Sequence, residues 1–231
     1  MMYMETKASR KPEIRADISA RKSPYEISVI DIGKSAHLTF RVGTGMCVEV
    51  SARALLDLVD DLSIRKEHLG FLLGYSDGGN VSFVRYKHSK IAFANRRLEV
   101  EYRRRDYVRE LQKFRMEGFD AQADIHNHPY EDQYRIPIRH SLRHHTAPFL
   151  LRHGLFGELE REGDLSEIDR KSAAKDHLRL EKEGVGYREN FSGVLSMFRV
   201  KHVDAAVRVL VLHARGLSRE PVGIKITEQC E

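Results

Sequence analysis

The stretch Ala121-Gln122-Ala123-Asp124-Ile125-His126-Asn127-His128-Pro129 carries the strongest structural signal in the chain. Side chains on an extended strand point alternately to its two faces. The two alanines and the isoleucine therefore share one face, and His126 and His128 share the other. Pro129 ends the strand because it has no amide hydrogen for a neighbouring strand. The pattern predicts a strand with one apolar face and two imidazoles that converge on one point.

Two imidazoles that converge in this way suit a divalent metal ion. A pair of surface histidines at a strand end gives the same short pattern by chance, so H-x-H alone leaves both interpretations open. Two further segments bear on the choice. Glu67 stands directly before the glycine-punctuated apolar stretch 68–74, where the alternative is a solvated glutamate at a helix-to-strand junction. Ser166 and Asp169 open a predicted helix, where the alternative is a simple capping box.

The other segments alternate between strand and helix patterns. Two strands, 25–32 and 37–42, indicate a hairpin, and Ser51 is the predicted N-cap of a helix over 51–62. The apolar face of that helix is expected to hold Leu55, Leu56, Val59 and Leu62. Further predictions are a hairpin over 68–87, a strand over 91–102, a helix over 106–117 ended by Gly118, and a short helix near 147–155 within an irregular 130–165. A helix over 166–184 and strands over 191–200 and 205–214 complete the predicted elements. This order lacks a strict βαβ rhythm and favours an α/β fold with a mixed sheet.

Together, these residues resemble the motif of the JAMM/MPN+ (Mov34/PAD-like) metalloprotease family. That motif is a glutamate ahead of a G-x-L-x-G-like strand, then H-x-H-P, then S-x-x-D. Here the pieces are Glu67 with Gly70 and Gly74, His126-Asn127-His128-Pro129, and Ser166-Glu167-Ile168-Asp169, and the resemblance covers about residues 48–213. The chain departs from the family in the length of 129–165, which we interpret as an insertion beside the active site. Ser141-Leu142-Arg143-His144 is the competing third piece, and it places a histidine where the aspartate is expected.

The resemblance implies a fold and a domain plan. The fold is a mixed β-sheet flanked by helices, the cytidine-deaminase-like MPN/JAB domain, with an N-terminal hairpin extension and an insertion near the active site. Residues 1–22 are expected to form a flexible basic tail. Residues 23–231 are expected to form a single domain, with its core at about 48–213 and the insertion at about 130–165. The chain is most similar to the free-standing, prokaryotic type of member.

The resemblance also implies a reaction. His126, His128 and Asp169 would bind Zn2+, Glu67 would take the proton of the activated water, and Ser166 would help to hold the oxyanion. The implied substrate is a ubiquitin-like protein or its conjugate, cut at a C-terminal peptide or isopeptide bond. The insertion would then be a lid, His140, His144 and His145 would lie in it or in solvent, and an activating enzyme is a potential partner.

The charge balance gives little support to a nucleic-acid partner. The 39 Lys plus Arg and 34 Asp plus Glu residues leave a net charge of +5, spread over segments of mixed sign. Nucleic-acid binders usually concentrate their positive charge, so a solvated surface is the favoured interpretation. Three alternatives stay open: a non-catalytic scaffold of the same fold, a peptidase for another small carrier protein, and a nucleic-acid-associated protein, which a pI of 9.2 and the Arg-rich loop 135–152 suggest.

Membrane and secreted classes do not fit the sequence. No apolar run approaches the length of a membrane span, and the N-terminus lacks the apolar stretch of a secretory signal. The only cysteines are Cys47 and Cys230, which excludes a disulfide framework and an all-cysteine zinc site. A reducing cytoplasm is the expected compartment, and Cys47 is expected to be structural.

Overall fold

The structure is a computed structural model of the chain, and its described parts cover most of the predicted elements. The described residues are 26–33, 36–43, 46–63, 67–90, 93–96, 99–101, 103–128, 151–200, 205–214 and 220–228. The predicted N-terminal tail 1–22 lies outside them. So do the first part of the predicted insertion and the competing segment 141–144.

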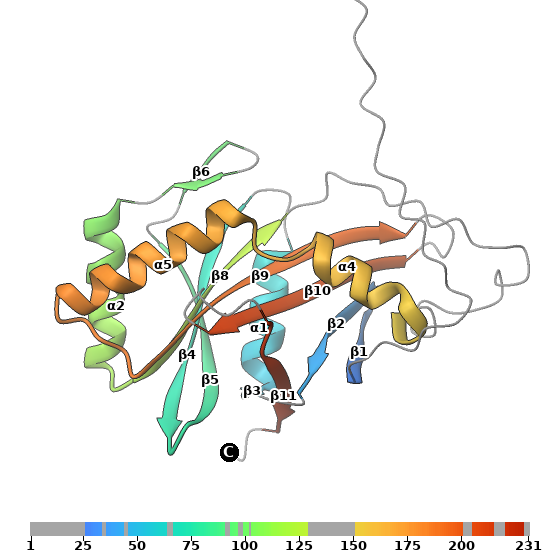
Figure 1. Cartoon of the computed structure of the whole chain (residues 1–231), viewed down its shortest axis with the longest axis horizontal. Helices are drawn as coiled ribbons and strands as arrows, with labels where there is room; N and C mark the ends of the chain where they lie inside the picture. Colours follow the sequence, from blue (N-terminus) through green and yellow to red (C-terminus); the bar gives the residue numbers. More distant parts are fainter. Residues whose placement is uncertain are drawn as a thin grey trace, which may run out of the picture.

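Within the described residues, nine strands form one mixed sheet in the order β1-β2-β10-β9-β8-β4-β5-β3-β11 (Figure 1). The strands are β1 (Glu26–Gly33), β2 (Ala36–Val42), β3 (Cys47–Ser51), β4 (Leu69–Asp77), β5 (Asn80–His88), β8 (Ala121–His128), β9 (Glu189–Val200), β10 (Ala205–Ala214) and β11 (Gly223–Thr227). Four neighbouring pairs are parallel, namely β2 with β10, β8 with β9, β3 with β5, and β3 with β11. The predicted α/β class with a mixed sheet is confirmed.

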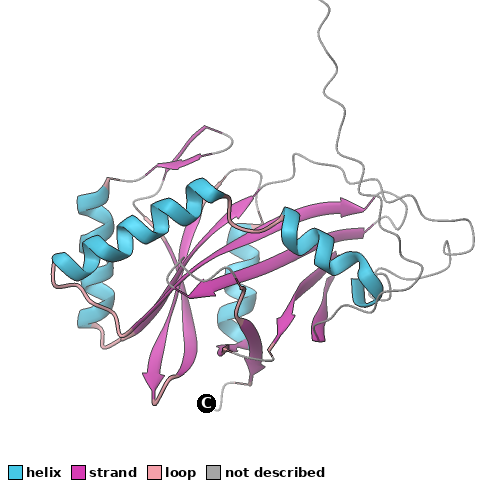
Figure 2. Ribbon diagram, viewed as in Figure 1, coloured by secondary structure: helices cyan, strands magenta, loops and turns pink. Residues whose placement is uncertain are grey.

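Helices cover both faces of this sheet (Figure 2). The helices are α1 (Ala52–Leu62), α2 (Arg104–Met116), α4 (Phe156–Glu162) and α5 (Glu167–Lys182), and a π-helical turn, Leu151–Leu155, leads into α4. One face packs on α1, and the opposite face packs on α2, α4 and the C-terminal end of α5. None of the helices in the described part of the chain has the length and apolar character that a membrane crossing needs.

The helix α1 begins where the sequence predicts. The Ser51 side chain accepts a hydrogen bond from the Ala54 amide, as an N-cap does. Leu55 and Leu62 are buried as predicted, but Leu56 is 51% exposed, so its predicted place on the apolar face is wrong. The buried stripe runs through Leu58 instead, because residues three and four apart share a helix face whereas adjacent residues diverge by about 100°.

The sheet curls around α1 so that its two ends approach each other. Residues of β2 and β11 join one core cluster with α1. Gly43 and Gly223 come so close that a Cβ on Gly223 would lie 2.2 Å from the Gly43 Cα. The predicted N-terminal hairpin, β1 with β2, pairs through β2 with β10 and therefore extends the central sheet.

Two predicted segments differ in the structure. Within 91–102, the described residues form two short antiparallel strands, β6 (Phe93–Arg96) and β7 (Glu99–Glu101), rather than one strand. The polar residues Asn95 and Arg96 end β6 and interrupt the apolar pattern of the sequence. The second difference concerns 130–165, which is not irregular throughout: from Leu151 to Glu162 it is helical.

The helical part of this segment belongs to the core. Leu151, Leu155 and Leu159 recur every four residues and are all buried, together with Phe156, against β9, β10 and the β1 strand. This spacing is typical of a helix, but the sequence predicted only a shorter helix, near 147–155. The segment that precedes Ser166 is therefore packed against the sheet. A short turn connects the end of α4 to the start of α5.

Candidate metal centre

The strand β8 alternates as its sequence predicts. Ala121, Ala123 and Ile125 are fully buried in the core with α1. His126 and His128 point to the other face of the sheet, where both approach Asp169 in the first turn of α5. The imidazoles thus converge as predicted, and the third residue of the predicted set joins them.

These three side chains form a group that can hold a metal ion. Their ligand atoms all lie within 4.8 Å of one another, and among the described residues no other such group of three is found. The two Nε2 atoms of His126 and His128 are 3.1 Å apart, and the Asp169 Oδ2 lies 3.8 Å and 3.9 Å from them.

The spacing fits a small divalent ion. A tetrahedral ion with bonds of about 2.0–2.1 Å holds neighbouring ligand atoms about 3.3 Å apart. The two histidines already have nearly this separation, and the carboxylate has to approach by about half an ångström. Two imidazole nitrogens and one carboxylate oxygen are also the donors of catalytic zinc sites, which keep a fourth position for water.

The electrostatics keep both imidazoles neutral, which metal binding requires. Burial and the neighbouring His128 lower the pKa of His126 to about 4, against the opposing charge of Asp169. Burial also lowers the pKa of His128, although the Asp169 and Asp164 carboxylates act in the other direction. Both rings therefore offer lone pairs at neutral pH.

Asp169 and Ser166 form the capping box that the sequence allows. The Ser166 Oγ accepts a hydrogen bond from the Asp169 amide at 3.2 Å, and the Asp169 Oδ2 accepts one from the Ser166 amide at 2.9 Å. The same Oδ2 faces both histidines. Capping and metal binding are therefore compatible, because the cap fixes the carboxylate in the direction of the imidazoles.

Glu67 is buried beside the strand that carries the histidines. Its side chain is only 7% exposed, so it is not a solvated junction residue. Leu69 pairs with His126, and the His68 amide donates to the Asn127 Oδ1 at 2.6 Å. These contacts place the chain directly after Glu67 beside His126 and Asn127.

Sequence reasoning missed a polar ladder between β8 and β9. The pairs Gln122 with Asn190, Asp124 with Ser192, and His128 with Ser196 are direct neighbours in the parallel register. Each pair is joined by a side-chain contact of 3.1–3.3 Å. Burial, with a smaller contribution from the nearby Asp176, raises the pKa of Asp124 to about 7 despite its hydrogen bonds. No local sequence signal identifies these pairs, because they depend on strand order.

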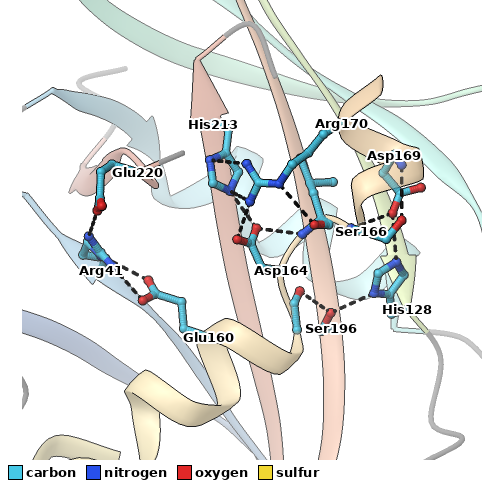
Figure 3. A network of polar contacts seen from close by, with 12 residues as sticks. Arg41, His128, Glu160, Asp164, Ser166, Asp169, Arg170, Ser196, His213 and Glu220 are labelled. Atoms are coloured by element: carbon cyan, nitrogen blue, oxygen red, sulfur yellow. Dashed lines mark hydrogen bonds and ion pairs between the residues drawn. The ribbon is translucent and has the colours of Figure 1, made fainter. Parts of the chain in front are cut away.

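A second missed feature holds the turn between α4 and α5 (Figure 3). Asp164 accepts hydrogen bonds from Arg170 and contacts the fully buried His213 of β10, with 2.6 Å between the His213 Nε2 and the Asp164 Oδ1. The Arg170 Nε donates to the Leu165 carbonyl at 3.3 Å. These contacts fix the chain directly before Ser166 and Asp169.

The structure describes only some of the other predicted residues. The histidines at 140, 144 and 145 lie outside the described residues, and so does Pro129. Cys47 is exposed and not part of a disulfide.

Comparisons with known proteins find little similarity. No protein family matches the chain, and no curated protein matches it. Among solved structures, the chain is similar to the solution structure of protein DSY2949 from Desulfitobacterium hafniense, with 12% sequence identity and a TM-score of 0.44. The matched region covers 80% of this chain and 95% of that protein.

Proposed function

We propose that the chain is a zinc-dependent metallopeptidase of the JAMM/MPN+ type. Its substrate would be a peptide or isopeptide bond at the C-terminus of a ubiquitin-like protein. The observation that carries the proposal is the convergence of His126, His128 and Asp169, whose ligand atoms lie within 4.8 Å of one another. The strand and the helix that supply them are far apart in sequence and meet only in the folded chain.

The order of elements around this centre supports an MPN-type domain as the finer description of the fold. Helix α1, the β4–β5 hairpin, helix α2, the histidine strand β8 and the capped helix α5 follow one another in that order. We infer that the segment before α5 is an addition to this plan, since α4 is anchored to β9 and β10 by its own apolar residues.

The residues around the centre have distinct chemical tasks. A bound zinc ion would supply an electrophile and lower the pKa of its water to about 7. The Glu67 carboxylate then accepts the proton of the attacking water and delivers it to the leaving amine. The Ser166 oxygen accepts the Asp169 amide, and its hydroxyl proton would be donated to the oxygen that becomes negative in the transition state.

A non-catalytic scaffold is less well supported than an enzyme. A scaffold needs no metal ligands and no carboxylate beside them. Glu67, His126, His128 and Asp169 are all present, and Glu67 is buried two residues before Leu69, the partner of His126. Activation of a water molecule is the function that would use all four residues together.

The substrate class rests on the family resemblance. A ubiquitin-like tail is extended and can add to a free strand edge, where main-chain hydrogen bonds hold it. An activating enzyme of the same carrier would be the natural partner. A small carrier of another fold with an extended C-terminus is the alternative substrate.

The test is cleavage of a ubiquitin-like protein that carries a C-terminal peptide extension, followed by mass spectrometry. Zinc-loaded wild-type protein is expected to cut after the carrier's last residue, to stop when a chelator is added, and to recover with zinc. Glu67→Gln is expected to keep its zinc and to cut at least about 100-fold more slowly, the usual contribution of a general base.

Glu117→Gln is the matched control, because Glu117 is exposed at the end of α2, where it pairs with the exposed Arg85. It is expected to cut at the wild-type rate. Cleavage by Glu67→Gln at the wild-type rate would refute the role of Glu67. No cleavage of any ubiquitin-like extension by zinc-loaded wild-type protein would refute the proposed substrate.

A further inference from the structure

The second ring nitrogen of His128 contacts a buried hydroxyl group. The His128 Nδ1 lies 3.3 Å from the Ser196 Oγ, and the Ser196 Oγ donates to the Gly163 carbonyl oxygen at 2.7 Å (Figure 3). Ser196 is 2% exposed. The three groups therefore form a short chain of hydrogen bonds behind the ring that faces Asp169.

Counting protons along this chain assigns each donor. A carbonyl oxygen can only accept, so the single hydroxyl proton of Ser196 lies on the bond to Gly163. The Ser196 Oγ can then only accept from the ring, and the proton of neutral His128 has to be on Nδ1. The Nε2 of His128 consequently carries a bare lone pair, and this is the atom that faces His126 and Asp169.

The packing around Ser196 leaves its hydroxyl group little room to change these hydrogen-bond partners. His128 and Ser196 are direct partners across β8 and β9. Gly163 ends α4 with a hydrogen bond from its amide to the Leu159 carbonyl at 2.8 Å. A Cβ on Gly163 would lie 2.8 Å from the Ser196 Cβ and 2.9 Å from a Phe198 ring atom, so the glycine backbone packs directly on β9.

We propose that Ser196, held by the Gly163 carbonyl, is a positioning residue of the metal centre that selects the Nδ1–H tautomer of His128. This proposal rests on the metal site of the proposed function but not on the peptidase reaction. Hydrogen bonds to the second nitrogen of a histidine ligand set its tautomer and ring orientation, and losing them costs about 10–100-fold in metal affinity. Through Gly163, the same contact ties β8 to the turn that leads into Ser166 and Asp169.

The chain offers a matched control on the same strand. Ser192 is also 2% exposed on β9 and lies four residues before Ser196, but it donates to Asp124. Ser196→Ala and Ser192→Ala therefore remove the same hydroxyl from equally buried places, and only the first removes the partner of His128. A general loss of packing would affect both variants alike.

Two measurements test the proposal. Ring ¹⁵N chemical shifts of His128 in the metal-free protein are expected to show Nδ1–H in the wild type and in Ser192→Ala, and a mixture with Nε2–H in Ser196→Ala. Zinc affinity, measured by competition with a chelator, is expected to fall about 10–100-fold in Ser196→Ala and less than about 3-fold in Ser192→Ala.

Several outcomes would overturn the proposal: Nε2–H on His128 of the metal-free wild type, a wild type that does not bind zinc, or equal zinc affinity in the two variants. If Ser196→Ala does not fold, Ser196→Cys keeps the volume with a weak S–H donor and is expected to give an intermediate loss of affinity. Zinc binding with the expected pattern but without peptide cleavage would leave this proposal standing and refute the proposed function.

Discussion

Leu69 of β4 lies directly opposite His126 of β8. The contacts continue between His68 and Asn127, and they place the buried Glu67 at the start of β4, next to the histidine strand. A buried carboxylate just before β4 and two imidazoles of β8 are thus brought close together from distant parts of the chain. Asp169, in the capped first turn of α5, supplies the third side chain of the candidate metal centre.

Asp169→Asn separates metal binding from helix capping. The amide oxygen of asparagine can still accept the Ser166 amide, so the free energy of unfolding should fall by less than about 1 kcal/mol. The charged ligand is lost, and zinc affinity should fall by more than the ~10–100-fold that an outer hydrogen-bond partner costs. Chelator competition and urea unfolding measure the two quantities on the same preparation.

The control for this experiment is His144→Ala in the competing segment, which lies outside the described residues. It is expected to bind zinc like the wild type. Loss of zinc in His144→Ala, together with retention in Asp169→Asn, would show that the third ligand comes from Ser141-Leu142-Arg143-His144 instead.

Asp164→Asn should destabilise the protein in a pH-dependent way. Burial alone would raise the pKa of Asp164, but the hydrogen bond and charge of His213, the Leu165 amide and the Arg170 charge outweigh it and lower the pKa. A lowered pKa in the folded state adds stability above the unfolded value of about 3.9, and this stability is lost as the pH falls through the folded value.

The substitution should therefore cost about 1–3 kcal/mol at neutral pH, typical of hydrogen bonds to a charged group, and less near pH ~3. Urea unfolding of both proteins at the two pH values, with a chelator present, measures the difference. An equal cost at both pH values would mean that the ionised carboxylate of Asp164 does not stabilise the turn.

Gly74→Ala should destabilise the sheet that positions the site. A Cβ at this position would lie 1.9 Å from the Ser82 carbonyl oxygen, where the β4–β5 register shifts. Relief requires backbone movement, so we expect a loss of about 1–3 kcal/mol or more. Gly186→Ala is the control, because a Cβ there meets nothing within 4 Å, and its effect should stay within ~0.5 kcal/mol. Similar unfolding midpoints for the two variants would contradict this account of β4.

Local patterns in the sequence predicted the elements that carry the site. The alternation over 121–128 predicted which residues of β8 face the core, and Ser51 and Ser166 predicted two helix starts. These succeed because side-chain alternation and capping depend on residues within one turn or one strand. The prediction of Leu56 on the buried face of α1 was wrong, because Leu58 and not Leu56 lies within the stripe of Leu55, Val59 and Leu62.

Contacts between distant segments could not be predicted. The pairing of His128 with Ser196 follows from the parallel register of β8 and β9, and that of His213 with Asp164 follows from strand order and the position of α4. A serine in an apolar strand and a histidine near a strand end look ordinary in sequence. Their roles appear only when topology brings them to the site.

The central claim is a metal centre built by His126, His128 and Asp169, and its most direct test is zinc content. Elemental analysis after dialysis against dilute zinc should find about one zinc per wild-type chain. It should find the same in His88→Ala, whose ring pairs with Asp61 instead. A folded His126→Ala/His128→Ala double variant should retain almost none. A metal-free wild type, or a double variant that keeps its zinc, would contradict the account.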